Sequence, residues 1–396
     1  MKLFYITPAR IPTEKAHGFQ ITKMCESFAR LNNEVTLIVP WRKNSKELTD
    51  RNPYDYYDLQ NNFKIRKVWL PDVLSINRFF PETIQYFLLV IHTLAFAFLA
   101  LFICLKHKPA LIITRDSRTA FLLSFFMKVI YESHQFSRNK LERFFERSAY
   151  KRCKNFIIIT QQLKLLYEKN GFNQKKLLVL PDGVDEHKFM VPISKEEARR
   201  KMNLPEKVKI VGYMGNFQTL EMEKGLIELI RCIKYIKDAT IRIAMIGGPM
   251  SHVPVYLKII ENEGLKKDNY IFRDKIAFRD VPVALKAFDC CVMPFPWTEH
   301  YAYYMSPLKM FEYMASERPI ITTDLPSVRE ILDEKSALFV PPSDEKALAE
   351  AIQKVLTDEM LASELAANAL QKSREYGWMN RAKSVLELFS MNDTKS

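Results

Sequence analysis

Glycine is scarce in this sequence, and several motifs built on small residues or metal ligands are absent. Only ten of the 396 residues are glycine. Neither GxGxxG nor GxxxxGK[ST] occurs, so neither a dinucleotide fingerprint nor a P-loop is supported. No Asp-x-Asp metal motif is present. The six cysteines form no CxxC pair and no Cys/His cluster with metal spacing, which argues against a structural zinc site. We expect reduced core cysteines in a cytoplasmic protein, and no metal site.

Charge is also absent from one long segment. Residues Thr83 to Leu105 carry none, and Lys106-His107-Lys108 follows. The segment is long enough to span a bilayer. However, the strand-like runs Val35–Val39 and Leu111–Thr114 on either side belong to one predicted sheet, which a membrane crossing would divide. We therefore expect a buried helix, or a helix lying partly in the membrane interface with its basic end at the headgroups. A membrane span is the disfavoured alternative. The apolar run at the N-terminus is too short for a signal peptide and predicts a first strand.

The composition is that of an ordinary globular protein with a basic surplus. Apolar residues make up 48% and charged residues 27% of the chain, and 59 Lys and Arg stand against 46 Asp and Glu, a net charge of +13. The surplus favours an anionic partner: a phosphorylated substrate, an acidic lipid surface or nucleic acid. No basic and aromatic stripe of the kind that binds nucleic acid is visible, so we expect no nucleic-acid partner.

Strand-like and helix-like segments alternate along the whole chain, which predicts parallel sheets covered by helices. The pattern restarts after Pro181-Asp182-Gly183-Val184-Asp185. In the second half we expect a strand at Lys209–Met214, a helix at Lys224–Ile236 and a short strand at Ile276–Phe278. The fold class is therefore α/β, with two successive doubly wound domains and a boundary near residues 185–205.

Several of the few glycines lie at predicted strand ends, where ligands bind in open parallel sheets. Gly215-Asn216 ends one strand, and Lys224 begins the next expected helix. A glycine turn followed by a lysine is a plausible grip for a diphosphate. Turns require glycine in any case, and a single lysine at such a place is more often a solvated one.

Ser306-Pro307-Leu308-Lys309 predicts a helix start: Ser306 as N-cap and Pro307 as the first helical residue. Such a start exposes unpaired backbone N–H groups, which attract anions. Lys309 adds a charge in the first turn, and Glu312 follows three residues later on the same face. Together they predict a site for a phosphate and a hydroxyl-bearing ring. An ordinary capped helix with a surface Lys–Glu pair fits this segment equally well.

Two further candidates lie in the first half of the chain. His134 follows a strand in Tyr131-Glu132-Ser133-His134 and could exchange a proton or hydrogen-bond a sugar hydroxyl. A histidine satisfied by packing is an equal alternative. Gly18 lies in the predicted loop from Pro8 to Phe19, where a glycine can bring a ligand near a helix start.

In order and spacing, these segments resemble the retaining glycosyltransferases of the GT-B fold, and within them the large family 4, over nearly the whole chain. The segments that carry the resemblance are Tyr131-Glu132-Ser133-His134, Pro181-Asp182-Gly183-Val184-Asp185, Gly212-Tyr213-Met214-Gly215 with Lys224-Gly225, Met245-Ile246-Gly247-Gly248-Pro249, and Ser306 to Ala315 with Pro319-Ile320-Ile321.

The resemblance implies two Rossmann-like domains facing a central cleft. Residues 1–190 would form the acceptor domain, with the helix 378–396 packing back on it, and residues 191–377 the donor domain. The donor would be a nucleotide diphosphate sugar, with UDP- or GDP-sugars favoured, and no further cofactor is implied.

Residue roles carry over position by position. Glu312 would contact the ribose, Lys224 would stabilise the departing diphosphate, and the amides after Ser306 would face phosphates or sugar. His134 would lie near the reacting sugar, and Gly18 near the acceptor and diphosphate.

Three positions depart from the family pattern. Tyr304 stands where the family has its first glutamate, with Glu299 nearby, and Asn216 where many members have arginine. Glu317 replaces a helix-ending glycine; if it is left-handed, it costs on the order of 1 kcal/mol.

We therefore expect a retaining, metal-independent transferase that acts on a glycan or lipid-linked acceptor, in the cytoplasm or at the inner face of the membrane. A GT-B sugar-nucleotide epimerase is one alternative, and the altered acid position motivates another, a degenerate GT-B protein that only binds. A phosphorylase would need a pyridoxal-binding lysine, and no such context is found.

Overall fold

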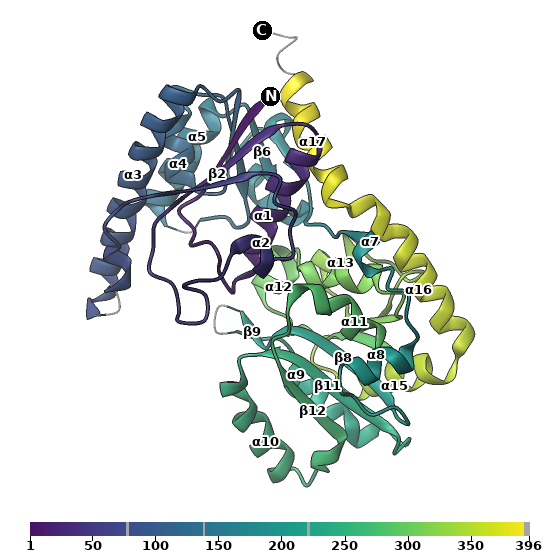
Figure 1. Ribbon diagram of the computed structural model, residues 1–396. Coiled ribbons are helices and arrows are strands. Elements are labelled where there is room, and N and C mark those ends of the chain that lie inside the picture. Colours follow the sequence, from purple (N-terminus) through teal and green to yellow (C-terminus); the bar gives the residue numbers. More distant parts are fainter. Residues whose placement is uncertain (77–78, 138, 220–221, 392–396) are drawn as a thin grey trace. The chain divides into compact units, whose positions relative to one another are not determined.

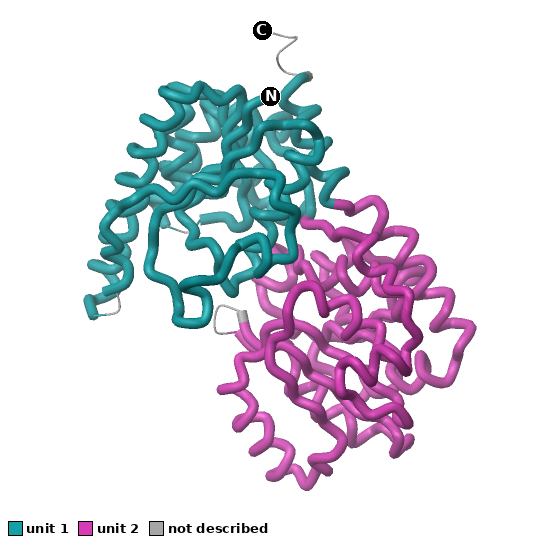
Figure 2. The backbone as a smooth tube through the Cα atoms, viewed as in Figure 1, with its two compact units in different colours: residues 1–181, 378–396 teal, residues 182–377 magenta. Residues whose placement is uncertain are grey.

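The computed structural model describes residues 1–76, 79–137, 139–219 and 222–391, which form two compact units (Figures 1 and 2). Unit 1 comprises residues 1–181 and 378–396, and unit 2 comprises residues 182–377. The chain thus leaves unit 1 after Pro181, whereas the sequence placed the boundary at residue 190. The end of the expected last helix, 392–396, lies outside the described residues.

Unit 1 is built on a seven-stranded parallel sheet with the order β3-β2-β1-β4-β5-β6-β7. Its strands are β1 (Lys2–Ile6), β2 (Glu34–Pro40), β3 (Lys64–Val68), β4 (Leu111–Thr114), β5 (Val129–Ser133), β6 (Asn155–Ile158) and β7 (Leu177–Val179). The inner strands β4, β5 and β6 are buried throughout, as expected for a sheet covered on both faces. The edge strand β3, rich in lysine and arginine, was not predicted.

The helices of unit 1 include one that is much longer than the rest. They are α1 (Ala16–Arg30), α2 (Pro53–Tyr56), α3 (Glu82–His107), α4 (Ser117–Leu123), α5 (Lys140–Arg152), α6 (Gln161–Lys169) and α17 (Trp378–Met391). Figure 1 shows α3 on the outer side of α4, and α4 packs in turn on α5. The C-terminal α17 packs on α1.

Unit 2 repeats this arrangement with a six-stranded parallel sheet in the order β12-β11-β8-β13-β14-β15. Its strands are β8 (Lys209–Asn216), β11 (Ile241–Gly248), β12 (Tyr270–Asp274), β13 (Cys290–Met293), β14 (Ile320–Thr323) and β15 (Leu338–Val340), with a small hairpin of β9 (Gln218–Thr219) and β10 (Met222–Glu223). In both units the order reverses beside the first strand, which is the doubly wound pattern.

Helices cover both faces of this second sheet. They are α7 (Glu186–Phe189), α8 (Lys195–Lys201), α9 (Leu226–Arg231), α10 (Val253–Asn262), α11 (Val281–Lys286), α12 (Glu299–Tyr303), α13 (Leu308–Ala315), α14 (Pro326–Arg329), α15 (Glu345–Thr357) and α16 (Glu359–Ser373). The helix expected over Lys224–Ile236 is shorter, because Gly225 is left-handed and a 3-10 turn follows Arg231. The strand expected at Ile276–Phe278 is wrong: the described residues there form a loop that enters a 3-10 turn.

The alternation of side chains along β8 divides the core of unit 2 between the two faces of its sheet. Ile210 and Met214 join the cluster that includes α13, whereas Val211 and Tyr213 join the cluster that includes α9, α10 and α15. Tyr213 is also three residues before the end of β8, where the candidate site lies.

Candidate functional site

The first component of the site is Gly215, near the end of the central strand β8. Its φ is 127°, a conformation that L side chains rarely adopt. A Cβ added there would lie 3.1 Å from Cε and 3.2 Å from Nζ of Lys309. Glycine at this position therefore leaves room for the lysine end to lie against the backbone of the strand.

Lys309, in the first turn of α13, is a buried amine with 8% of its surface exposed. Its Nζ lies 3.5 Å from the centre of the Tyr213 ring, and within the described residues it has no hydrogen-bond partner. Burial holds the pKa of Lys309 well below its ordinary value, and Lys224 adds to this while Glu312 opposes it. Because buried polar groups normally have partners, this amine is an unexplained donor.

Lys224, next to the left-handed N-cap Gly225 of α9, is also buried, with 9% exposed. Burial lowers its pKa to about 8, against a smaller raising effect of Glu223. The Glu223 carboxylate accepts the backbone N–H groups of Gly225 and Leu226 and so caps α9. Gly225 is required sterically, because a Cβ there would overlap the carbonyl oxygen of Pro294.

Glu312 lies one turn after Lys309 on the same helix and is half-buried. Burial raises its pKa to about 7, and Lys309 partly offsets this. Two lysines whose charge is disfavoured and a carboxyl that ionises near neutrality therefore lie together in unit 2. A diphosphate would favour the charged form of both amines.

The prediction for Ser306 as a helix cap is wrong. The helix begins at Leu308, Pro307 is the N-cap with extended backbone, and no side chain among the described residues caps it. The Ser306 hydroxyl instead accepts a hydrogen bond from the backbone N–H of Asp182 at 3.0 Å. Its oxygen therefore has a partner outside the helix. Glu317 after this helix is left-handed at φ 56°, as the missing glycine suggested.

The other two residues that depart from the family pattern, Tyr304 and Asn216, form hydrogen bonds within unit 2, Asn216 through its backbone. Tyr304 donates its hydroxyl to Oε1 of Glu299 at 2.8 Å, which links the family's acid position to an acid five residues earlier. The Asn216 carbonyl accepts the Tyr213 hydroxyl at 2.7 Å. Tyr213 is thus oriented at its hydroxyl by Asn216 while its ring faces Lys309.

In unit 1, His134 follows β5, and its Nε2 lies 2.6 Å from Oε1 of Glu132. Burial, and next Arg115, lower the pKa of His134 to about 3, while Glu132 opposes the shift. The imidazole is therefore neutral at physiological pH and donates Nε2–H to the carboxylate. Sequence reasoning quoted Glu132 but gave it no role, although an acid within a buried strand is itself a signal.

The expectation that Gly18 lies in a loop is wrong, because α1 begins at Ala16. A Cβ on Gly18 would lie 2.2 Å from the Tyr57 hydroxyl and 2.4 Å from Cγ2 of Thr13. Close packing within unit 1 explains this glycine.

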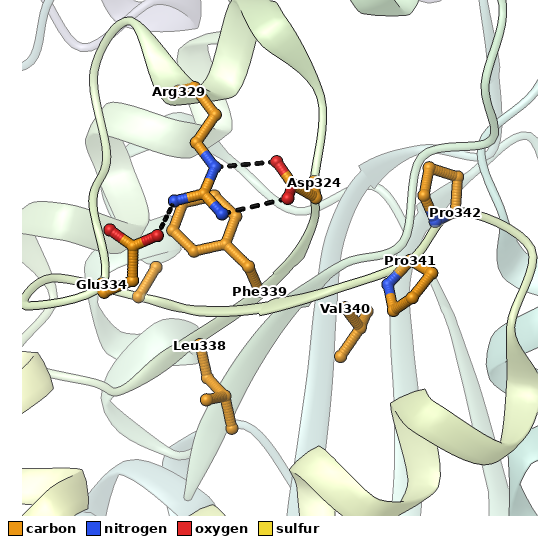
Figure 3. A pocket seen from close by; sticks show the side chains of 9 residues that line it. Asp324, Arg329, Glu334, Leu338, Phe339, Val340, Pro341 and Pro342 are labelled. Carbon is orange, nitrogen blue, oxygen red and sulfur yellow. Dashed lines mark hydrogen bonds and ion pairs between the residues drawn. The ribbon is translucent and has the colours of Figure 1, made fainter.

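A separate pocket in unit 2 shows how a paired cation differs from Lys309 (Figure 3). It is lined by Asp324, Arg329, Glu334, Phe339 and neighbouring residues. Arg329 forms two hydrogen bonds to Asp324, at 2.7 and 3.0 Å, another to Glu334, and stacks on Phe339. This guanidinium is already neutralised by carboxylates, so the pocket is a poorer candidate for an anion.

Comparison with known families identifies the class. Residues 18–188 match the family described as Glycosyltransferase Family 4, and residues 208–358 match Glycosyl transferases group 1. The chain belongs to this family of glycosyltransferases.

Solved structures share the fold over the full length. The sucrose-phosphate synthase of Thermosynechococcus elongatus has a TM-score of 0.73 at 18% identity, and the alignment covers 100% of each chain. Anabaena HepE in complex with UDP has a TM-score of 0.72 at 15% identity, covering 99% of this chain and 100% of that one. Each unit of the protein is thus a Rossmann-like domain of the GT-B type.

Curated relatives are more similar in sequence than these structures, but they match over a shorter stretch. The D-inositol 3-phosphate glycosyltransferase of Corynebacterium urealyticum is 25% identical over 243 residues, which are 59% of this chain and 56% of the relative. TuaC of Bacillus subtilis, named for teichuronic acid biosynthesis, is 26% identical over 211 residues, 53% of this chain and 49% of the relative. The chain therefore matches about half the length of these relatives.

Proposed function

We propose that this protein transfers a sugar from a nucleotide diphosphate sugar, a UDP- or GDP-sugar, to a glycan or lipid-linked acceptor in polysaccharide or glycolipid biosynthesis. The observation that carries the proposal is the buried Lys309 amine, which has no hydrogen-bond partner among the described residues and lies in one site with Lys224 and Glu312. The HepE structures in complex with UDP and with UDP-glucose support a nucleotide-sugar donor.

Each residue then has a role. Lys224 and Lys309 offset the charge that develops on the departing nucleoside diphosphate, and fixed protein cations can do this without a metal ion. Glu312 accepts hydrogen bonds from the ribose hydroxyls. The backbone from Ser306 through Pro307 to Leu308 and the strand end at Gly215 and Asn216 line the donor, with Tyr304 beside the sugar. The family resemblance implies a role for His134 near the reacting sugar. Retention of configuration follows the family.

A panel of UDP-, GDP- and ADP-sugars tests this proposal, with transfer and hydrolysis measured for the wild type, Lys224→Ala and Glu312→Ala. We expect turnover with one nucleotide class and a loss of roughly 100-fold in each variant. Lys346→Ala, at an exposed lysine of the same unit, should behave as wild type. Donor binding without turnover, unchanged by either variant, would instead favour a protein that only binds. Tyr304, in the place of the family's first glutamate, motivates this alternative.

The surface of α3 supports contact with a membrane, which we propose to be its cytoplasmic face. One side of the helix is buried against unit 1, while the other carries large exposed apolar side chains at helical spacing: Ile84, Phe87, Ile91, Phe98, Phe102 and Leu105. This α3 stripe runs about 32 Å along the helix. By length and composition alone α3 could cross a membrane, but β3 before it and β4 after it belong to one sheet. The helix therefore lies along a membrane rather than across it.

Charge supports an anionic bilayer as the partner of the α3 stripe. Unit 1 contains 32 Lys and Arg and 16 Asp and Glu, a net charge of +16. Juxtamembrane basic residues each contribute about 1 kcal/mol on anionic lipid. The basic helix α5 packs on α4, next to α3.

Vesicle co-sedimentation tests the membrane assignment. Wild type should bind vesicles rich in phosphatidylglycerol more than neutral ones, and less at high salt. The double variant Phe98→Ser with Phe102→Ser should lose binding, whereas Met360→Ser, at an exposed methionine of unit 2, should not. A double variant that changes the oligomeric state and leaves vesicle binding intact would show that a second copy covers the stripe instead.

A further inference from the structure

Arg381 of α17 is a buried arginine whose guanidinium contacts the end of β5 and the segment by which the chain leaves unit 1. Nη1 lies 3.2 Å from Oε2 of Glu132, and Nη2 lies 3.2 Å from Oε1 of the same carboxylate. Nε donates to the Pro181 carbonyl at 2.8 Å, and Nη2 also to that of Leu180 at 3.2 Å. A lysine could not reproduce this forked geometry.

Glu132, which receives this fork, is 1% exposed. Its Oε1 also accepts Nε2 of Gln20 at 2.8 Å, and Arg115 fixes the Gln20 amide by donating to its oxygen at 2.6 Å. Burial alone would raise the pKa of Glu132, but Arg381 and the hydrogen bond from His134 hold it well below its ordinary value. The group is therefore a carboxylate with a fixed orientation.

A fixed carboxylate determines which nitrogen of His134 carries the proton. Oε1 can only accept, so the neutral imidazole donates Nε2–H to it at 2.6 Å, and the lone pair is on Nδ1. If Glu132 were protonated, its carboxyl group could donate to Nε2, and the proton of the neutral ring would then lie on Nδ1.

We propose that Arg381 is a positioning residue for His134: by holding Glu132 ionised and in place, it sets the tautomer and orientation of the imidazole. The proposal rests on the proposed function, in which His134 lies near the reacting sugar. Arg381, on the last helix and 249 positions beyond Glu132, thus fixes the orientation of His134 through Glu132.

The test combines ¹⁵N NMR of the histidine rings with steady-state kinetics. The chain has seven histidines, and His134→Gln identifies the signal. Wild type should show the Nε2–H tautomer. Arg381→Gln should show a mixed or Nδ1–H ring and a kcat at least tenfold lower, with a smaller change in donor KM. Arg381→Lys should keep the tautomer and recover part of kcat. Lys383→Gln, at an exposed residue on the same helix, is the control.

An unchanged His134 tautomer in a folded Arg381→Gln would overturn the proposal, as would a kcat equal to that of Lys383→Gln. If Arg381→Gln does not fold, Gln20→Leu removes another donor to Oε1 and must shift the same ring signal. Failure of the proposed function has a different outcome: the tautomer shifts in Arg381→Gln, but His134→Gln keeps full activity.

Discussion

The two units share a strand order but treat a buried lysine in opposite ways. In unit 1, Lys23 is 1% exposed, and its Nζ lies 2.7 Å from Oε2 of Glu26. In unit 2, Lys309 is almost as buried and, within the described part of the chain, has no hydrogen-bond partner. The first amine is paired with a carboxylate of the protein, whereas the second lies over the Tyr213 ring, and we propose that a ligand pairs with it.

The net charges of the two units do not follow the pairing of these lysines. Unit 1 carries +16, whereas unit 2, with 27 Lys and Arg and 30 Asp and Glu, carries −3. The candidate diphosphate site nevertheless lies in the acidic unit. A small anion is recognised by a few desolvated amines, while a surplus spread over a surface suits a partner as extended as a membrane. The two anionic partners that we propose therefore belong to different units.

Replacing each buried lysine by methionine should give the largest contrast. Lys23→Met leaves the buried Glu26 without its cation, which should destabilise the fold by about 3 kcal/mol or more. Lys309→Met removes an unsatisfied group in a matching shape, so the fold should be as stable or about 1 kcal/mol more stable, while transfer falls roughly 100-fold. Urea unfolding and transfer assays measure both. Equal loss of stability in the two variants would refute the assignment of Lys309 to a ligand.

Backbone at the end of β8 gives the next effect. Gly215→Ala places a side chain at a φ that is strained for alanine, and puts a methyl group beside the Lys309 amine. Nucleotide affinity should therefore fall about tenfold, and the free energy of unfolding by about 1–3 kcal/mol. Gly264→Ala is the matched control, because its φ is 66° and no atom of the described residues lies within 4 Å of the added Cβ. Calorimetric titration with UDP or GDP distinguishes an effect of backbone strain from an effect on the nucleotide site. An affinity loss of the same size in Gly264→Ala would contradict the site-specific explanation.

The pH dependence of nucleotide binding should be smaller. The pKa of Lys224 is about 8 in the free protein, and a diphosphate prefers its protonated form. Affinity should therefore fall as the pH rises above about 8, by at most tenfold per pH unit. Lys224→Ala should flatten this limb. A wild-type affinity that is constant from pH 7 to pH 9.5 would contradict the role of Lys224.

Local pattern predicted the central strands and the α13 segment, and the order of the motifs carried the resemblance to the family. Neither predicted how the polar groups pair. Alternation and β-branched runs mark β8, β13 and β14, because their period reflects burial within the sheet. The Ser306 hydroxyl was misassigned because its partner, the Asp182 amide, lies 124 residues away. The missing partner of Lys309 and the fork of Arg381 are likewise tertiary facts, which helix propensity and capping rules do not contain. Sequence thus predicted residue types at the site better than their contacts.

Glu312→Gln should have the smallest effect on stability, and its sign is informative. Burial raises the pKa of Glu312 to about 7 from 4.5, so the folded state binds more protons than the unfolded state between these values, and stability due to this group declines as the pH rises through them. Above pH 7 the charged form is the disfavoured one in the fold. Glu312→Gln should therefore stabilise the protein by about 1 kcal/mol at pH 8 and by less at pH 5, while it lowers transfer. Glu350→Gln, at an exposed glutamate, should show no such pH trend. A gain at pH 8 with a loss of transfer would mean that this carboxylate is kept for the donor at the expense of the fold, whereas a loss of stability at pH 8 would mean that Glu312 serves mainly to neutralise Lys309.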